Sequence, residues 1–223
     1  MQDKVNLKID WASHEAAKYA CLNWHYSKTI PVNKLVKIGV WENDKFIGVL
    51  IFGKGTSATL HKQFNLESTE VCELVRVALS NHINPVSKMM AIAIKFLKRG
   101  CPELKVIVSF ADPSEGHHGG IYQATNWIYT GNSADTNEYF YNNSWRHATD
   151  VYKRLSSDKI KMLQKRKKTG KYRYVFPLNQ EMYNIVIKQK KPYPKRMKQA
   201  MVDSIDTAKV QHLSIRSTEL SEL

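Results

Sequence analysis

The chain has 223 residues, of which 43% are hydrophobic and 10% aromatic, so it can bury the core of one sizeable domain. No apolar run approaches the roughly 18 residues of a membrane span, and residues 1–11 lack the apolar stretch of a secretory signal. The three cysteines form no CxxC pair, which argues against a zinc ribbon or disulfide scaffold and fits a reducing compartment.

Charge is distributed unevenly along the chain. The 34 Lys and Arg exceed the 20 Asp and Glu, for a net charge of +14. Residues 153–198 hold 16 Lys and Arg against Asp158 and Glu181, so the remainder is close to neutral. One basic segment on a neutral body indicates a polyanionic partner, and nucleic acid fits better than a membrane, for which no amphipathic helix is evident.

The first half of the chain predicts one helix among strands. Ser13 is typical of an N-cap, and apolar residues recur on one face of the stretch that follows it. Asn43-Asp44 predicts a tight turn between two strands. We expect strands at 5–11, 36–42, 46–52 and 71–79, and a helix at 14–24.

The second half predicts a buried helix followed by a buried strand. Asn84 as N-cap and Pro85 as first helical residue start a helix over 86–98 that is apolar almost all round. The continuous apolar run at 105–111 is typical of a buried parallel strand. A short helix at 119–126 and strands near 128–131, 137–142 and 145–153 complete the elements.

This order predicts a mixed α/β fold in which a helix crosses between two parallel strands. Both the order and the sequence GGIYQATNWIYTG at 119–131 resemble the GNAT acyltransferase fold, with Tyr122 and Trp127 at its tyrosine and aromatic positions. We expect a GNAT-like catalytic domain at 1–155. A basic extension at 156–198 is expected to pack on that domain and contact DNA, followed by a flexible tail at 199–223.

A narrower resemblance rests on four segments: NWHYSKTIP (23–31), ELVRVAL (73–79), 109–131 and PYPKR (192–196). Together they resemble the phage Mom family over roughly residues 5–198. The resemblance implies an enzyme that adds a small acyl- or carbamoyl-type group, such as methylcarbamoyl, to adenine N6 in double-stranded phage DNA. Such a protein would protect phage DNA from host restriction, in the cytoplasm of the infected bacterium.

Two alternatives remain open from the sequence. The first is an acyl-CoA-dependent N-acetyltransferase acting on another amine, and the second is a DNA-binding protein without catalysis. Acyl-CoA enzymes of this fold grip the diphosphate with glycine-loop amides at a helix N-terminus. Residues 80–85 contain no glycine, which argues against acyl-CoA, and the group donor is not identified by the sequence.

A histidine, a tyrosine and a carboxylate are the first candidates for chemistry. His25 and Tyr26 follow the first helix and can bind a metal or move protons, or else cap the helix and fill the core. Asp112 follows a buried strand and can act as a base, a metal ligand or a turn cap. The resemblance implies that His25 and Tyr26 bind iron and that Asp112 belongs to the active site, and N and O donors suit that metal.

The loop SEGHHGG at 114–120 is the best candidate for substrate contact. Glycine permits tight backbone, and imidazole can bind a metal, a proton or a phosphate. We therefore predict substrate binding by His117, His118, Gly119 and Gly120, against the alternative of a flexible surface loop.

Three further residues are candidate catalytic groups. Arg76 lies in a strand, beside Leu74 and Ala78 on one face, where it can bind an anion or form a buried ion pair with Glu70 or Glu73. Tyr122 matches a place where this fold often has a tyrosine that protonates the leaving group, and otherwise packs in the core. Ser109 interrupts an apolar strand and can line a cleft.

The basic segment alternates cations with aromatic residues. Cations neutralise phosphates, whereas the aromatics can stack on bases or pack the segment onto the body. The predicted DNA-binding residues are Lys165, Arg166, Lys167, Lys168, Lys171, Arg173, Lys195 and Arg196.

Overall fold

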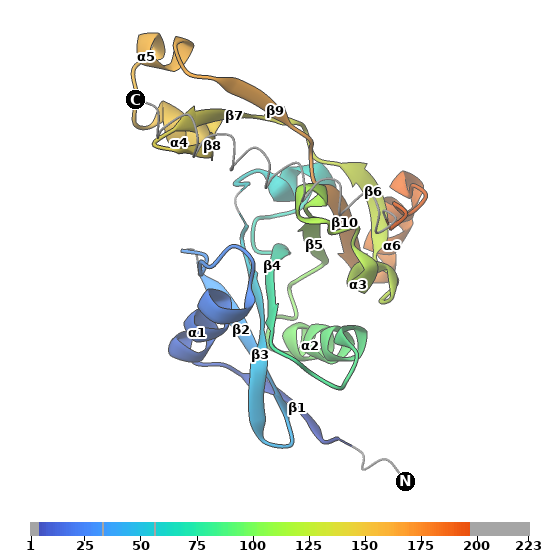
Figure 1. Cartoon of the computed structure of the whole chain (residues 1–223). Coiled ribbons are helices and arrows are strands. Elements are labelled where there is room, and N and C mark those ends of the chain that lie inside the picture. Colours follow the sequence, from blue (N-terminus) through green and yellow to red (C-terminus); the bar gives the residue numbers. More distant parts are fainter. Residues whose placement is uncertain (1–4, 33, 56, 197–223) are drawn as a thin grey trace.

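A computed structural model describes residues 5–32, 34–55 and 57–196 (Figure 1). Its strands are β1 (Leu7–Trp11), β2 (Leu35–Glu42), β3 (Lys45–Gly53), β4 (Val71–Leu79), β5 (Val106–Ala111), β6 (Ile128–Asn132), β7 (Thr136–Tyr141), β8 (Ser144–His147), β9 (Lys165–Lys168) and β10 (Tyr172–Pro177). Its helices are α1 (His14–Trp24), α2 (Val86–Gly100), α3 (Gly120–Gln123), α4 (Ala148–Tyr152), α5 (Ser157–Lys161) and α6 (Gln180–Val186), with short 3-10 turns η1 (Leu60–Phe64), η2 (Pro113–Glu115) and η3 (Ile187–Gln189).

One large mixed sheet organises the described chain. Seven strands lie in the order β1-β2-β3-β4-β5-β10-β6, and β8-β7-β9 form a second, small sheet. In the large sheet β4 and β5 are parallel, with α2 crossing between them, and the other neighbours are antiparallel. The predicted mixed α/β fold is therefore confirmed.

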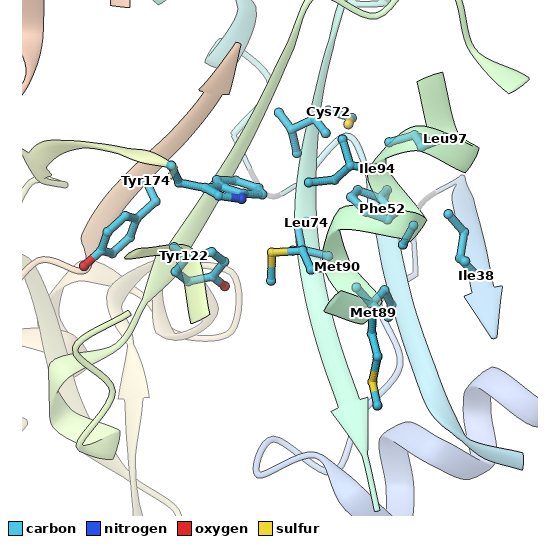
Figure 2. Close-up of a cluster of buried hydrophobic side chains, with 14 of the residues drawn as sticks. Ile38, Phe52, Cys72, Leu74, Met89, Met90, Ile94, Leu97, Tyr122 and Tyr174 are labelled. Carbon is cyan, nitrogen blue, oxygen red and sulfur yellow. The ribbon is translucent and has the colours of Figure 1, made fainter. Parts of the chain in front are cut away.

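Helices cover both faces of the large sheet. Alternate strand residues point to opposite faces, so in β3 Val49 and Ile51 pack with α1 while Leu50 and Phe52 pack with α2. The α6 helix covers the same face of the sheet as α1, where its Met182 packs over β5 and β10. Figure 2 shows the cluster on the second face, where side chains from α2 meet those of the sheet.

Local signals place α1 and the β2–β3 turn as predicted. The Ser13 side chain accepts a hydrogen bond from the Ala16 amide at 3.1 Å and so caps α1. Asn43 and Asp44 both take left-handed backbone, with φ of 47° and 62°, which matches the twist of a two-residue hairpin.

The α2 helix corrects two predictions. It begins at Val86 with Pro85 as its N-cap, so Asn84 lies one residue outside the helix. It is also not buried all round, because Lys88, Ile92 and Lys95 are exposed on its outer side. Its apolar residues cover a broad stripe that packs on the sheet, and the rest faces solvent.

The strand expected at 145–153 ends at His147. The His147 side chain accepts a hydrogen bond from the Thr149 amide at 3.2 Å and starts α4. Asp150 then pairs with Arg146 and Arg154, each four residues away, which supports a helix. The helix predicted at 119–126 is likewise shorter, since α3 ends at Gln123 and Asn126 has a φ of 60°.

Part of the basic segment belongs to the large sheet itself. Its residues 172–177 form β10, an interior strand of the large sheet between β5 and β6. The predicted boundary at 155/156 falls between α4 and α5, in the small lobe that carries β7, β8 and β9 (Figure 1). The predicted tail, 199–223, lies outside the described residues.

The strands β4 and β5 pair over a short stretch only, and beyond it a gap opens between them. Their register runs from Val71–Val106 to Glu73–Val108, after which the strands separate. The β3–β4 register shifts between Ile51 and Phe52, which sets Val75 in a bulge. A bulge redirects the following side chain, so Leu74 packs with α2 while Ala78 packs with α1, and these two do not share a face as predicted.

Candidate functional site

A cleft of about 590 Å³ opens where β4 and β5 separate. The sides are formed by β4 from Leu74 to Leu79, by the end of β5, and by residues 116–122. The end of α1, with Trp24, and the two residues that follow it form a fourth side. The polar side chains that line it are His25, Tyr26, Arg76, His82, His117, His118, Tyr122 and Arg196, and no acidic residue is among the described residues at its wall. The cleft therefore favours a neutral or anionic ligand.

His25 is a buried, neutral imidazole at the wall of the cleft. Its Nδ1 accepts a hydrogen bond from the Ser27 amide at 3.1 Å and lies 2.8 Å from the Ser27 hydroxyl. Burial, and then the charges of Arg76, His117 and Lys28, lower the pKa of His25 to about 4. Because Nδ1 accepts, the neutral ring carries its proton on Nε2 and serves as a hydrogen-bond donor.

Tyr26 joins His25 to the glycine-rich loop. Its ring centroid lies 4.3 Å from that of His25 and 5.3 Å from that of His117, the latter in an edge-on arrangement. Burial and then the charge of Asp112 raise the pKa of the Tyr26 phenol. The side chain is 49% exposed, so a protonated phenol is available to a ligand in the cleft. His25 and Tyr26, predicted as members of one site, both line the cleft.

Asp112 is buried and fully engaged by its neighbours. Its Oδ1 accepts hydrogen bonds from the amide and the hydroxyl of Ser114, at 3.0 and 2.6 Å. Its Oδ2 lies 3.3 Å from Lys168 Nζ and 3.5 Å from Lys171 Nζ. Burial opposes ionisation, but the Ser114 bonds and the two ammonium groups outweigh it and hold the pKa of Asp112 below its ordinary value.

These contacts do not support the expected iron site. Asp112 is not among the residues that line the cleft, and a metal ion would have to displace two ammonium groups from its carboxylate. The described residues contain no group of three or more His, Cys, Asp and Glu placed to hold a metal ion. His25, Tyr26 and Asp112 therefore do not form a ready iron site in this structure.

Ser109 and Tyr122 form a buried pair, of which Tyr122 lines the cleft whereas Ser109 lies behind it and does not. The Ser109 hydroxyl lies 2.8 Å from the carbonyl oxygen of Leu74 and 2.7 Å from the Tyr122 hydroxyl. It thus bridges β4 and β5 just where they part. Burial raises the pKa of Tyr122 to about 12, so the phenol keeps its proton, and its ring also packs in the core (Figure 2).

Arg76 faces the cleft without a carboxylate partner among the described residues. Its guanidinium donates to the carbonyl oxygens of Val75 at 2.7 Å and Thr29 at 3.4 Å. The ion pair considered with Glu70 does not form, because Glu70 pairs with Lys105 at 2.6 Å. An arginine held by backbone carbonyls retains its full charge for an anionic ligand.

The predicted loop 117–120 forms one wall of the cleft. Tyr174 on β10 fixes it, since its hydroxyl donates to the His118 carbonyl at 2.6 Å. Gly119 has a φ of +83°, and a Cβ there would lie 2.3 Å from the Tyr174 ring. Glycine is thus required for the close approach of loop and strand. The His117 and His118 side chains both line the cleft.

The predicted DNA-binding cations divide into paired and unpaired groups. Arg166 pairs with Glu138 at 2.6 Å and Lys167 with Asp135 at 3.3 Å. Arg173 is half-buried and donates to Thr130 and Gln63. Lys165 and Lys195 are exposed with no ion pair to a described residue, whereas Arg196 lines the cleft. Among the aromatics, Tyr174 is core, and Tyr193 donates to the Trp127 carbonyl at 2.7 Å.

Sequence reasoning missed Glu42, at the end of β2. Its carboxylate accepts from the amides of Ile83 and Asn84, at 2.9 and 2.6 Å, and from Asn84 Nδ2 at 2.9 Å. These amides belong to the turn before α2, where the expected fold would bind a CoA diphosphate. Glu42 thus occupies these two amides, whereas residues 79–82 of the same turn line a separate hollow. A glutamate 41 residues before Ile83 gives no local signal of this contact.

Comparison with known proteins settles the family. Residues 6–195 match the Mom protein family. The chain belongs to this family. It is 26% identical over 207 residues to the protein named methylcarbamoylase mom of Escherichia phage Mu, covering 85% of this chain and 84% of that protein.

Solved acetyltransferase structures are also similar to this Mom family chain. An acetyltransferase of Bacillus subtilis in complex with CoA has a TM-score of 0.46 at 15% identity, over 79% of this chain and 100% of that one. The aminoglycoside acetyltransferase AAC(6')-Ib in complex with coenzyme A and kanamycin has a TM-score of 0.47 at 11% identity, over 82% and 99%. None of the described helices is long and apolar enough to span a membrane.

Proposed function

We propose that this chain transfers a small acyl- or carbamoyl-type group, such as methylcarbamoyl, to adenine N6 in double-stranded phage DNA. It would act in the cytoplasm of the infected host and protect the DNA from restriction. The observation that carries the proposal is the cleft at the β4–β5 separation, in a chain of the Mom family. The name of the phage Mu relative, methylcarbamoylase, supports the group transferred.

The charge of the cleft suits a nucleotide. Arg76 and Arg196 line it, and its described wall is free of carboxylates. Adenine N6 is paired inside the duplex, so the base must be flipped out, which costs a few kcal/mol. A phosphate of the flipped nucleotide bound by Arg76 would offset part of that cost.

The reaction joins N6 to the carbonyl carbon of the donor, breaks the bond to the leaving group and moves one proton from N6. We assign proton removal to His117 or His118, whose imidazoles line the cleft. Tyr26, protonated at neutral pH, would donate to the leaving group, and His25 Nε2–H would stabilise charge on the carbonyl oxygen. Tyr122 and Ser109 would fix the base of the cleft behind the reacting atoms.

Asp112 receives a positioning role in this proposal. Its Ser114 and lysine contacts tie the loop that carries His117 to the segment of Lys168 and Lys171. A second hollow of about 530 Å³ is lined by residues 113–115 of that loop and by Arg166 to Thr169. Phosphates bound in this hollow, with further contacts to Lys165 and Lys195, would hold the duplex beside the cleft.

The test is the mass of the nucleosides in host DNA after expression of the chain. Wild type should produce a deoxyadenosine of increased mass. Arg76→Ala should reduce its amount at least about tenfold, the effect of losing roughly 1.4 kcal/mol of binding. Arg99→Ala, an exposed arginine at the end of α2, is the matched control and should leave it unchanged. Unmodified nucleosides from well-expressed wild type would refute the proposal.

A further inference from the structure

The last described residues, 190–196, run beside β6 and are called the C-terminal strap below. The Lys191 amide donates to the Tyr129 carbonyl at 2.8 Å, and the Tyr193 hydroxyl donates to the Trp127 carbonyl at 2.7 Å. Both prolines of the strap restrict its backbone and lack amides that would otherwise need partners. The strap is therefore held in one place although it is neither helix nor strand.

The strap meets the glycine-rich loop of the cleft at Gln123. The Gln123 Nε2 atom lies 3.2 Å from the Pro194 carbonyl oxygen and 3.1 Å from the His118 carbonyl oxygen. It also lies 3.1 Å from the Tyr174 hydroxyl, and the Tyr174 and Tyr193 rings stack with their centroids 6.4 Å apart. Because these groups share partners, the strap and the loop are fixed relative to each other.

The strap brings a second guanidinium to the cleft. Arg196 lines the cleft together with Arg76 of β4. Backbone carbonyls hold Arg76 in place, whereas Arg196 is exposed and follows the anchored Tyr193 by three residues. No carboxylate among the residues that the structure describes lines the cleft, so both guanidiniums are available to anions. Guanidinium binds phosphate oxygens in pairs, and two guanidiniums suit a ligand with two phosphates.

We propose that Arg196 binds a backbone phosphate next to the flipped adenine, and that Tyr193 is a positioning residue that brings Arg196 to it. With Arg76 on the other phosphate of that nucleotide, the cleft recognises a nucleotide within a DNA strand and not a free nucleotide with a single phosphate. Because Gln123 joins the strap to the loop of His118, phosphate binding also steadies that loop beside the base. This inference rests on the proposed function, since it concerns the DNA substrate of that reaction.

The test is the binding of a short DNA duplex with one unpaired adenine to the full chain, measured by fluorescence anisotropy. Three forms are compared: the unmodified duplex, and two in which a neutral methylphosphonate replaces the phosphate on the 5′ or the 3′ side of the adenine. Wild type should bind each neutral form at least about tenfold more weakly, because each loses one charged hydrogen-bonded contact.

Arg196→Ala should bind the unmodified duplex at least about tenfold more weakly than wild type. It should lose nothing more from one of the two neutral forms, since the contact is already absent. Arg99→Ala removes an exposed arginine at the end of α2 and should behave as wild type with all three forms.

Tyr193→Ala removes both the ring stacking and the bond to Trp127. It should weaken binding as much as Arg196→Ala does, and the double variant should bind no more weakly than either single variant. Tyr193→Phe keeps the ring and should restore part of the affinity. Tyr183→Phe, at a tyrosine that is 44% exposed on α6, should bind as wild type.

Equal binding of the unmodified duplex by wild type and Arg196→Ala would overturn the inference, as would an Arg196→Ala protein that both neutral forms weaken as they weaken wild type. A loss from Tyr193→Ala that adds to the loss from Arg196→Ala would overturn the positioning role. Any of these results together with modified host DNA refutes this inference alone. Unmodified host DNA with the expected binding results refutes the proposed group transfer and leaves the phosphate contact intact.

Discussion

Replacing Asp112 separates a positioning role from a catalytic one. Breaking a buried ion pair costs 3–5 kcal/mol when the remaining charge stays buried. Here Lys168 and Lys171 are 27% and 45% exposed and can turn to solvent, so Asp112→Asn should lower the free energy of unfolding by about 1–2 kcal/mol. Asp112→Ala also loses the bond to the Ser114 amide, which adds about 1 kcal/mol.

Thermal unfolding at pH 7 measures both variants. At about 2–4 °C per kcal/mol for a chain of this size, Asp112→Asn should lower the melting temperature by about 4 °C and Asp112→Ala by about 8 °C. Because asparagine keeps the loop contact, Asp112→Asn should retain part of the DNA modification that Asp112→Ala loses. Equal loss of modification in both variants, or an unchanged melting temperature, would refute the reasoning.

Three further predictions follow from the geometry. The pKa of His25 near 4 lies below its unfolded value near 6.5, so folding stability should fall as the pH drops from 6.5 to 4, and His25→Gln should flatten that part of a urea-denaturation pH profile. A profile unchanged by the substitution would contradict the burial of a neutral imidazole. Gly119→Ala should destabilise the fold by about 3 kcal/mol or more, because it combines a positive φ with overpacking against Tyr174. Gly116→Ala, with φ +71° and open space around it, should cost only about 1–2 kcal/mol. Equal melting temperatures of the two variants would exclude the close approach of Gly119 to Tyr174. Replacing Lys165 and Lys195 together with alanine should reduce the salt slope of DNA binding by about 2, and an unchanged slope would place the duplex elsewhere.

The sequence predicts the helices and strands up to residue 111 well because the signals there are local. The Ser13 cap, the Asn43-Asp44 turn and the apolar run at 105–111 each depend on neighbours in sequence. The position of residues 172–177 inside the large sheet could not be predicted from such local signals. Alternating cations and aromatics are typical of an exposed basic strand, yet Tyr174 inserts into the core because β5 and β6 leave a place between them.

The sequence predicted residues of the candidate site but not the long-range contacts that hold them in place. The residues at the end of α1 and in the loop 116–120 meet at one cleft, as their positions after predicted elements suggest. The partners of Asp112 and Glu42 lie 56 and 41 residues away for their nearest contacts with Lys168 and Ile83. Such pairings depend on strand order, which a single sequence does not encode in a readable pattern.

The most direct test of the central claim compares two tyrosines. Tyr26 is 49% exposed in the cleft, and Tyr19 is 55% exposed on the outer side of α1. Modified deoxyadenosine in host DNA should fall at least about tenfold with Tyr26→Phe and stay at the wild-type amount with Tyr19→Phe. Full modification by a folded Tyr26→Phe protein would contradict the assignment of the cleft as the site of group transfer.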